Sequence, residues 1–170
     1  LELRMDYAPR ADLKRLIETR RKPVIVTCRP EREGGQFRGE ESERLALLQR
    51  AIDLGADYVD VEWDSVGALR RGGHTRMIVS RHDFRRVPEN LESLHAELVA
   101  AGADIAKIAC TATSILDNLR IFRLLKSTKH PTIALCMGEA GAISRVLGRK
   151  YGAFLTFGSA ARGKESAPGQ

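Results

Sequence analysis

A lysine inside an apolar run is the residue of this sequence best suited to covalent chemistry. Lys107 lies in the run IAKIA (105–109), which is typical of a buried strand. Lysine is almost never fully buried without a partner or a chemical role. Desolvation favours the neutral amine, which can attack a ketone and form an iminium. Spacing alone is equally compatible with a lysine on the outer side of the strand, its stem buried and its ammonium in water.

A histidine just past the preceding strand is the candidate for proton transfer. His82 lies in SRHDF (80–84), and an imidazole can act as a general acid–base near neutral pH. A lone histidine is more often structural, but a place on the strand next to a buried lysine favours catalysis. The other histidines lie in predicted loops or on helix surfaces and receive no role; they are His74, His95 and His130.

Polar segments containing glycine follow two other predicted strands. The loop CRPEREGG (28–35) carries Arg29 and Glu33, which we expect to contact a ligand or to orient a catalytic group, although an ordinary solvated loop would look the same. The segment MGEAGAISR (137–145) leads into a helix whose free amides attract anions, and Arg145 can bind a carboxylate through two hydrogen bonds. The tail from 159 to 170 is small and polar, as in a flexible end or a lid.

Short apolar runs alternate with amphipathic stretches along the chain. The apolar runs predict seven strands, at Leu1–Met5, Val24–Cys28, Tyr58–Glu62, Met77–Ser80, Ile105–Ala109, Thr132–Met137 and Phe154–Phe157. Helices are predicted around Leu13–Ile17, from Glu41 to Leu54, from Pro88 to Gly102, after Ser114 and from Ala142 to Gly148. We expect Leu13, Leu16 and Ile17 to form the buried stripe of the first helix. Asp117, three positions after Ser114, predicts a capping box at the start of the fourth. This alternation predicts an α/β fold with a parallel sheet and helices outside it.

Polar or special residues lie at or near the carboxyl ends of six consecutive predicted strands. They are Glu2 and Arg4, Arg29, Asp60 and Glu62, His82, Lys107, and Met137 with Gly138. An open doubly wound sheet needs such residues only beside its switch point, whereas every strand of a barrel ends at one mouth. We therefore predict a single (β/α)8 TIM-barrel domain over residues 1–170. Because such barrels usually need about 250 residues, we expect the first strand and helix and the last helix to lie outside the sequence.

Composition and charge narrow the class of partner. With 43 % hydrophobic and 29 % charged residues, the chain is typical of a soluble globular protein, and no run approaches the ~20 apolar residues of a membrane span. The net charge of +6 is scattered, and its densest group, between Lys14 and Lys22, is explained by a solvated helix face. We expect a small anionic substrate and neither a nucleic-acid nor a membrane partner. A homodimer is compatible with the sequence.

The three cysteines predict neither a zinc site nor a disulfide framework. Cys28, Cys110 and Cys136 are far apart, odd in number and form no CxxC pair. They are typical of small buried residues in a reducing compartment, which indicates the cytoplasm.

Seven runs together resemble the successive motifs of type I 3-dehydroquinate dehydratase. They are ELRMD, TCRPEREGGQFRG, SRHDF, GADIAKIA, MGEAGAISRVLG, TFGS and SAPGQ, in the family's order and at similar spacing over essentially the whole chain. Leu135-Cys136-Met137 and Cys110-Thr111-Ala112 depart from the pattern and alter packing only. The resemblance implies a shikimate-pathway lyase that dehydrates 3-dehydroquinate to 3-dehydroshikimate without cofactor or metal.

The resemblance also implies roles for individual residues. Lys107 would form the Schiff base with the substrate ketone, His82 would be the general acid–base, and Glu33 would orient His82. The implied substrate contacts are Arg145 at the carboxylate, Glu2, Arg4 and Arg29 at ring hydroxyls or the pocket wall, Met137 and Phe157 at the apolar wall, and Ser166 and Gln170 from a closing loop.

Two other functions stay open on the residues alone. A class I aldolase shares the Schiff-base lysine but cleaves a C–C bond. A degenerate barrel would serve as a binding module without turnover. The sequence does not decide between a biosynthetic and a catabolic role, or whether the chain is part of a longer or bifunctional protein.

Overall fold

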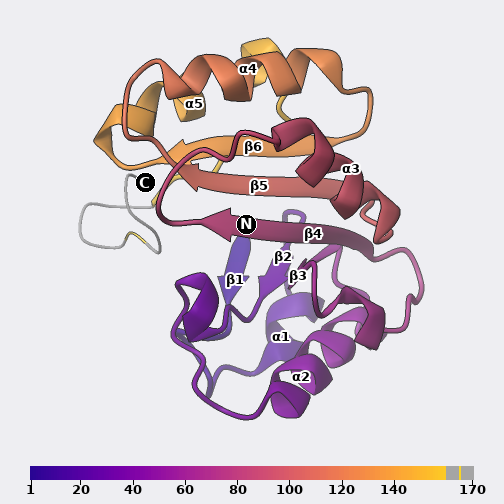
Figure 1. Ribbon diagram of the computed structural model, residues 1–170. Coiled ribbons are helices and arrows are strands. Elements are labelled where there is room, and N and C mark those ends of the chain that lie inside the picture. Colours follow the sequence, from indigo (N-terminus) through magenta and orange to yellow (C-terminus); the bar gives the residue numbers. More distant parts are fainter. Residues whose placement is uncertain (160–164, 166–170) are drawn as a thin grey trace. The chain divides into compact units, whose positions relative to one another are not determined.

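Figure 1 shows a computed structural model, which describes residues 1–159 and 165. The fold is α/β, with six parallel strands that follow one another in chain order, from β1 to β6. The chain divides into two compact units, residues 1–79 and 80–170, and the boundary falls inside β4 (Arg76–Asp83). Each unit is described by itself below. None of the helices in the described part of the chain combines the length and apolar character that a membrane crossing needs.

The first unit is built on three parallel strands covered by helix α2. Its elements are β1 (Glu2–Arg4), α1 (Leu13–Glu18), β2 (Ile25–Thr27), the 3-10 turn η1 (Glu31–Glu33), α2 (Glu41–Asp53), β3 (Tyr58–Glu62), the 3-10 turn η2 (Val66–Ala68) and the start of β4. Arg4 pairs with Thr27, and Thr27 pairs with Asp60, so the polar ends of these strands are in register. Leu48, Ala51 and Ile52 form the buried stripe of α2 against β2 and β3.

The second unit repeats the strand–helix pattern. After the end of β4 come α3 (Leu91–Ala100), β5 (Ile105–Thr111), α4 (Asp117–Ser127), β6 (Thr132–Met137), the 3-10 turn η3 (Glu139–Gly141), α5 (Ala142–Leu147) and the 3-10 turn η4 (Gly148–Tyr151). Helix α3 packs on β5, and α4 and α5 pack on β6, as Figure 1 shows. The ring of Phe122 stacks on that of Tyr151 at 4.1 Å, which fixes η4 to α4.

The end of α3 and the start of α4 carry the residues expected at helix ends. Gly102, after α3, has a φ of 93°, a left-handed conformation that glycine adopts at no steric cost. At the start of α4, Asp117 Oδ2 accepts hydrogen bonds from the backbone N–H groups of Thr113 and Ser114 at 2.8 and 3.0 Å. This is the reaching-back half of a capping box, as the spacing of Ser114 and Asp117 predicts.

Four expectations about local structure are wrong. Phe154–Phe157 is not a strand: Phe154 N–H donates to Thr132 O at 2.8 Å, but no β-ladder continues beyond it. Strand β4 extends to Asp83, so His82 lies inside it rather than after it. Helix α3 begins at Leu91, not Pro88, and the carbonyl oxygens of Val87 and Pro88 accept hydrogen bonds from the Arg120 guanidinium instead of joining the helix. Leu16 is 38 % exposed and does not join Leu13 and Ile17 in the core.

The cysteines confirm the prediction of small buried side chains. All three are free and buried. Burial raises the pKa of Cys28 and of Cys136 to about 12, so both thiols stay protonated at neutral pH.

His95 is buried, whereas the sequence had indicated a loop or a helix surface. It is 8 % exposed, and its Nε2 lies 2.8 Å from Thr132 Oγ1 at the start of β6. The His95 and His130 rings meet edge to face at 6.1 Å. Burial, with a smaller contribution from His130, lowers the pKa of His95 below its usual 6.5, because a charge there would lose its water.

We predict that this buried imidazole makes the free energy of unfolding fall as the pH drops below about 6.5. The unfolded chain takes up a proton at that pH before the folded His95 does, so acid favours unfolding. His95→Gln removes the titration and should flatten this slope in urea unfolding measured from pH 8 to pH 5. His74→Gln, at an exposed histidine, is the matched control and should keep the wild-type slope. Equal slopes in both variants would contradict the prediction.

Candidate active site

Arg29 is the buried centre of the polar cluster in the first unit. Its Nη2 donates to Asp60 Oδ1 at 2.7 Å, and its Nη1 donates to Glu62 Oε1 at 2.5 Å. The side chain is only 4 % exposed. Burial disfavours its charge, but the two carboxylates outweigh burial, so the pKa of Arg29 is raised. Asp60 and Glu62 alternate with Val59 and Val61 along β3 and so share one face of that strand.

Glu2 and Arg4 are also held by neighbours within this unit. Thr27 Oγ1 donates to Glu2 Oε1 at 2.8 Å. Arg4 binds Asp6 through Nε at 2.8 Å and through Nη2 at 2.6 Å, which is a bidentate pair. The carboxylate of Asp6 also accepts from the backbone N–H of Gln36 at 3.0 Å. Asp6 therefore connects β1 to the loop that carries Glu33.

The loop with Glu33 folds back tightly onto Arg29. Glu33 is part-buried in the turn η1, and its N–H donates to Pro30 O at 3.0 Å. The N–H of Phe37 donates to Arg29 O at 3.1 Å, which closes the loop. A Cβ on Gly35 would lie 1.9 Å from Arg29 O, so this close approach needs glycine. The second glycine of the CRPEREGG run thus has a packing reason.

Lys107 is buried in β5, as predicted. The residue is 5 % exposed, and its Nζ lies 4.3 Å from the centre of the Phe157 ring, within range of a cation–π contact. Its strand neighbours Ile108 and Cys110 face the other way and line a cavity against α3. The outer-facing lysine that spacing alone allowed is therefore wrong.

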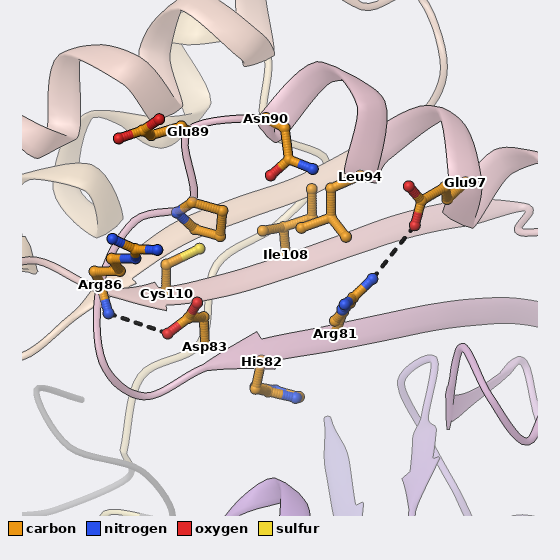
Figure 2. A pocket seen from close by; sticks show the side chains of 11 residues that line it. Arg81, His82, Asp83, Arg86, Glu89, Asn90, Leu94, Glu97, Ile108 and Cys110 are labelled. Atoms are coloured by element: carbon orange, nitrogen blue, oxygen red, sulfur yellow. Dashed lines mark hydrogen bonds and ion pairs between the residues drawn. The ribbon is translucent and has the colours of Figure 1, made fainter.

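The strand alternation also gives the direction of His82. A cavity of about 610 Å³ lies on the α3 side of β4 and β5, and His82 is among the residues that line it. Figure 2 shows Arg81 and Asp83 turned into this cavity, whereas the ring of His82 points to the opposite side of β4. Because the cavity takes Ile108 from β5, Lys107 and His82 share the face away from α3. The His82 ring stacks on Phe84 at 5.9 Å.

Arg145 joins this group through Phe157. Its Nη1 donates to the Phe157 carbonyl at 3.2 Å, and the ring of the same residue lies under Lys107. Burial lowers the pKa of Arg145, since its guanidinium is withdrawn from water. Met137, 3 % exposed, ends β6 opposite Thr111 of β5. The second unit therefore brings together a buried amine, a part-buried guanidinium and an aromatic ring.

Two residues of the polar cluster were not predicted from the sequence, and two predicted site residues lie outside the part of the chain that the structure describes. Asp6 and Arg44 were missed, although an arginine four positions before Leu48 on the apolar stripe of α2 signals burial. Ser166 and Gln170 lie outside the described residues. Among the described residues, no group of three or more His, Cys, Asp or Glu side chains is placed to hold a metal ion.

The comparison with protein families decides the family. The family model described as type I 3-dehydroquinase matches residues 1–170. The chain belongs to this family. The resemblance found in the seven sequence runs is therefore confirmed.

Relatives of this chain show how much of its sequence is shared. It is 43 % identical over 173 residues to the bifunctional 3-dehydroquinate dehydratase/shikimate dehydrogenase, chloroplastic, of Arabidopsis thaliana, with 97 % of this chain but 29 % of the plant protein covered. The chain thus spans less than a third of that relative's length.

Two crystal structures are similar to this chain in fold. The 3-dehydroquinate dehydratase of Geobacillus kaustophilus HTA426 gives a TM-score of 0.86 at 32 % identity, over 100 % of this chain and 74 % of that one. The type I enzyme of Clostridium difficile, described with covalent modified comenic acid, gives 0.81 at 26 % identity, over 99 % of this chain and 75 % of that one.

We predict that Asp6→Asn destabilises this protein by about 2–3 kcal/mol at pH 7, because it leaves the Arg4 guanidinium without its buried carboxylate. Although burial opposes it, pairing with Arg4 lowers the pKa of Asp6 below that of the unfolded chain. The stabilisation is therefore complete above about pH 4 and is lost as the pH falls through the folded value. Urea unfolding at pH 7 measures the destabilisation, and urea unfolding at pH 3 measures how much of it is lost in acid. The exposed Asp53→Asn is the control. A loss of stability no larger than that of the control would refute the prediction.

Proposed function

We propose that this protein catalyses the dehydration of 3-dehydroquinate to 3-dehydroshikimate through a Schiff base on Lys107. The observation that carries the proposal is a lysine, 5 % exposed, inside a strand whose alternation turns it to the side toward which the His82 ring points. Membership of the type I 3-dehydroquinase family supports the same reaction. The covalent adduct described for the Clostridium difficile relative is in keeping with a nucleophilic residue in this family.

The chemistry uses the amine as an electron sink. The Lys107 amine attacks the substrate ketone, and loss of water gives an iminium. The iminium acidifies the adjacent C–H, His82 takes that proton, and the electron pair moves into an enamine. Return of the pair expels the hydroxyl, which leaves as water with the proton from His82. Hydrolysis of the product iminium restores Lys107, so the net change is the loss of one water from the substrate.

Arg145 is the proposed partner of the substrate carboxylate. Arg4 and Arg29 are occupied by the carboxylates of Asp6, Asp60 and Glu62, whose charges a substrate anion would have to oppose. The pKa of Arg145, in contrast, is lowered by burial. An incoming carboxylate would accept charge-assisted hydrogen bonds from that guanidinium, and its negative charge would oppose the cost of burying the positive one.

The remaining roles rest on the family resemblance. We propose that Glu33 orients His82, that Glu2, Arg4 and Arg29 bind ring hydroxyls, that Met137 and Phe157 form the apolar wall, and that Ser166 and Gln170 close over the substrate. We further propose that the chain forms most of a single (β/α)8 barrel and works in the cytoplasm without cofactor or metal. Whether it forms a homodimer stays a prediction that light scattering would test.

Trapping with borohydride tests the Schiff base directly. Intact mass should show one reduced adduct after incubation with 3-dehydroquinate and borohydride, and peptide mapping should place it on Lys107. Lys107→Ala should give no adduct. Lys126→Ala is the matched control, because this exposed lysine also lies over an aromatic ring, that of Tyr151 at 5.3 Å, and its loss should leave trapping unchanged. An adduct in Lys107→Ala, or no adduct in the folded wild type, would contradict the proposal. An adduct only with an aldol substrate would favour a class I aldolase.

Arg145→Gln tests the carboxylate contact. Loss of a charge-assisted hydrogen-bonded pair should raise KM by roughly 10- to 100-fold. Trapping on Lys107 should persist at high substrate concentration, because the amine is intact. The exposed Arg149→Gln on η4 is the control and should keep the wild-type KM. Steady-state kinetics of both variants that gave the same KM would assign the carboxylate to another residue.

A further inference from the structure

A fully buried arginine lies behind Arg29 in the first unit. Arg44, on α2, is 0 % exposed. Its Nη1 donates to Glu62 Oε2 at 2.5 Å and to the carbonyl of Cys28 at 3.1 Å. Its Nε and Nη2 bind the carboxylate of Glu41 at 2.8 and 2.6 Å. These four hydrogen bonds fix the plane and the position of its guanidinium group.

The carboxylate of Glu62 is shared between two arginines. Oε2 accepts from Arg44, and Oε1 accepts from Nη1 of Arg29 at 2.5 Å. Asp60 binds the other Nη of Arg29 at 2.7 Å. The four buried side chains, each at most 4 % exposed, are Arg29, Arg44, Asp60 and Glu62. Two positive and two negative charges are therefore balanced without water.

Because both arginines bind the carboxylate of Glu62, Arg44 limits the orientations that the Arg29 guanidinium can adopt. The terminal torsion of a glutamate is broad, so a carboxylate with one partner can rotate. Glu62 cannot do so while each of its oxygens is held by a different guanidinium. Because Arg29 in turn depends on Glu62 and Asp60, the direction of its guanidinium is set by contacts that begin on α2.

We propose that Arg44 is a positioning residue, which acts through Glu62 to hold Arg29 in the orientation that binds substrate. The inference rests on the proposed function, in which Arg29 binds ring hydroxyls. Arg44 itself touches no substrate. It orders the binding group before substrate arrives, so its contribution belongs to KM rather than to the proton transfers that set kcat.

Kinetics of Arg44→Met provide the test. KM for 3-dehydroquinate should rise about tenfold, as expected for the loss of one well-aligned charge-assisted contact, with kcat within about twofold of wild type. Arg44→Lys keeps the charge but not the planar fork, so it should recover only part of the wild-type KM. The exposed Arg50→Met on the same helix is the matched control and should keep the wild-type KM.

A double-mutant cycle separates positioning from general destabilisation. If Arg44 acts through Glu62, Arg44→Met should raise KM little further in a Glu62→Gln background. Additive effects, or an unchanged KM in a folded Arg44→Met, would overturn the inference. Circular dichroism establishes folding at the assay temperature. If Arg44→Met does not fold, Arg44→Lys carries the same cycle, and a wild-type KM there would overturn the inference equally.

Borohydride trapping distinguishes this inference from the proposed function. A wild-type protein that gives no Lys107 adduct defeats the proposed function. A wild-type protein that traps normally, beside an Arg44→Met variant with an unchanged KM, defeats only the role of Arg44. The expected result is trapping on Lys107 in both proteins, with the variant needing about ten times more substrate for half-maximal adduct.

Discussion

Side chains alternate between the two faces of a buried strand, and the placement of Asp60, Glu62 and Lys107 depends on that constraint. In β3 and β5, apolar residues fill the face that packs on helices, and the buried charged residues lie on the other face. Val59 and Val61 separate Asp60 from Glu62 along β3. In β5, Ile108 and Cys110 face α3, which turns Lys107 to the opposite face. Burial of one face by helices thus selects the residues available for chemistry on the other.

Buried charges are handled differently in the two units. In the first unit, each buried guanidinium meets carboxylates, and the pKa of Arg29 is raised as a result. Such a group is fixed and unreactive, which suits recognition. In the second unit, the Lys107 amine lies over an aromatic ring, and burial lowers the pKa of Arg145. These surroundings suit the Schiff-base role proposed for Lys107 and the carboxylate-binding role proposed for Arg145.

Much of the fold could be predicted from apolar runs and from the residues that begin and end helices. Six of the seven predicted strands exist, and Gly102 ends its helix as expected, since these features depend on local periodicity and on glycine. The seventh, Phe154–Phe157, has the composition of a strand but lacks a continued ladder, which only a neighbouring chain segment can provide. Leu16 and His95 were misplaced because helix periodicity gives the relative direction of side chains, not which elements cover them.

The sequence by itself determined the family, the parallel α/β class and the identity of the chemical groups, including Lys107, His82 and Arg145. These follow from residue types at fixed spacing along one chain. Only the tertiary structure decided that Lys107 lies under Phe157, that Asp6 binds Arg4, and that Arg44 reaches Glu62 from a different element. Such contacts join residues far apart in sequence or depend on which face is buried. Packing sets both, because a buried charge adopts the geometry in which its partners replace the water it has lost.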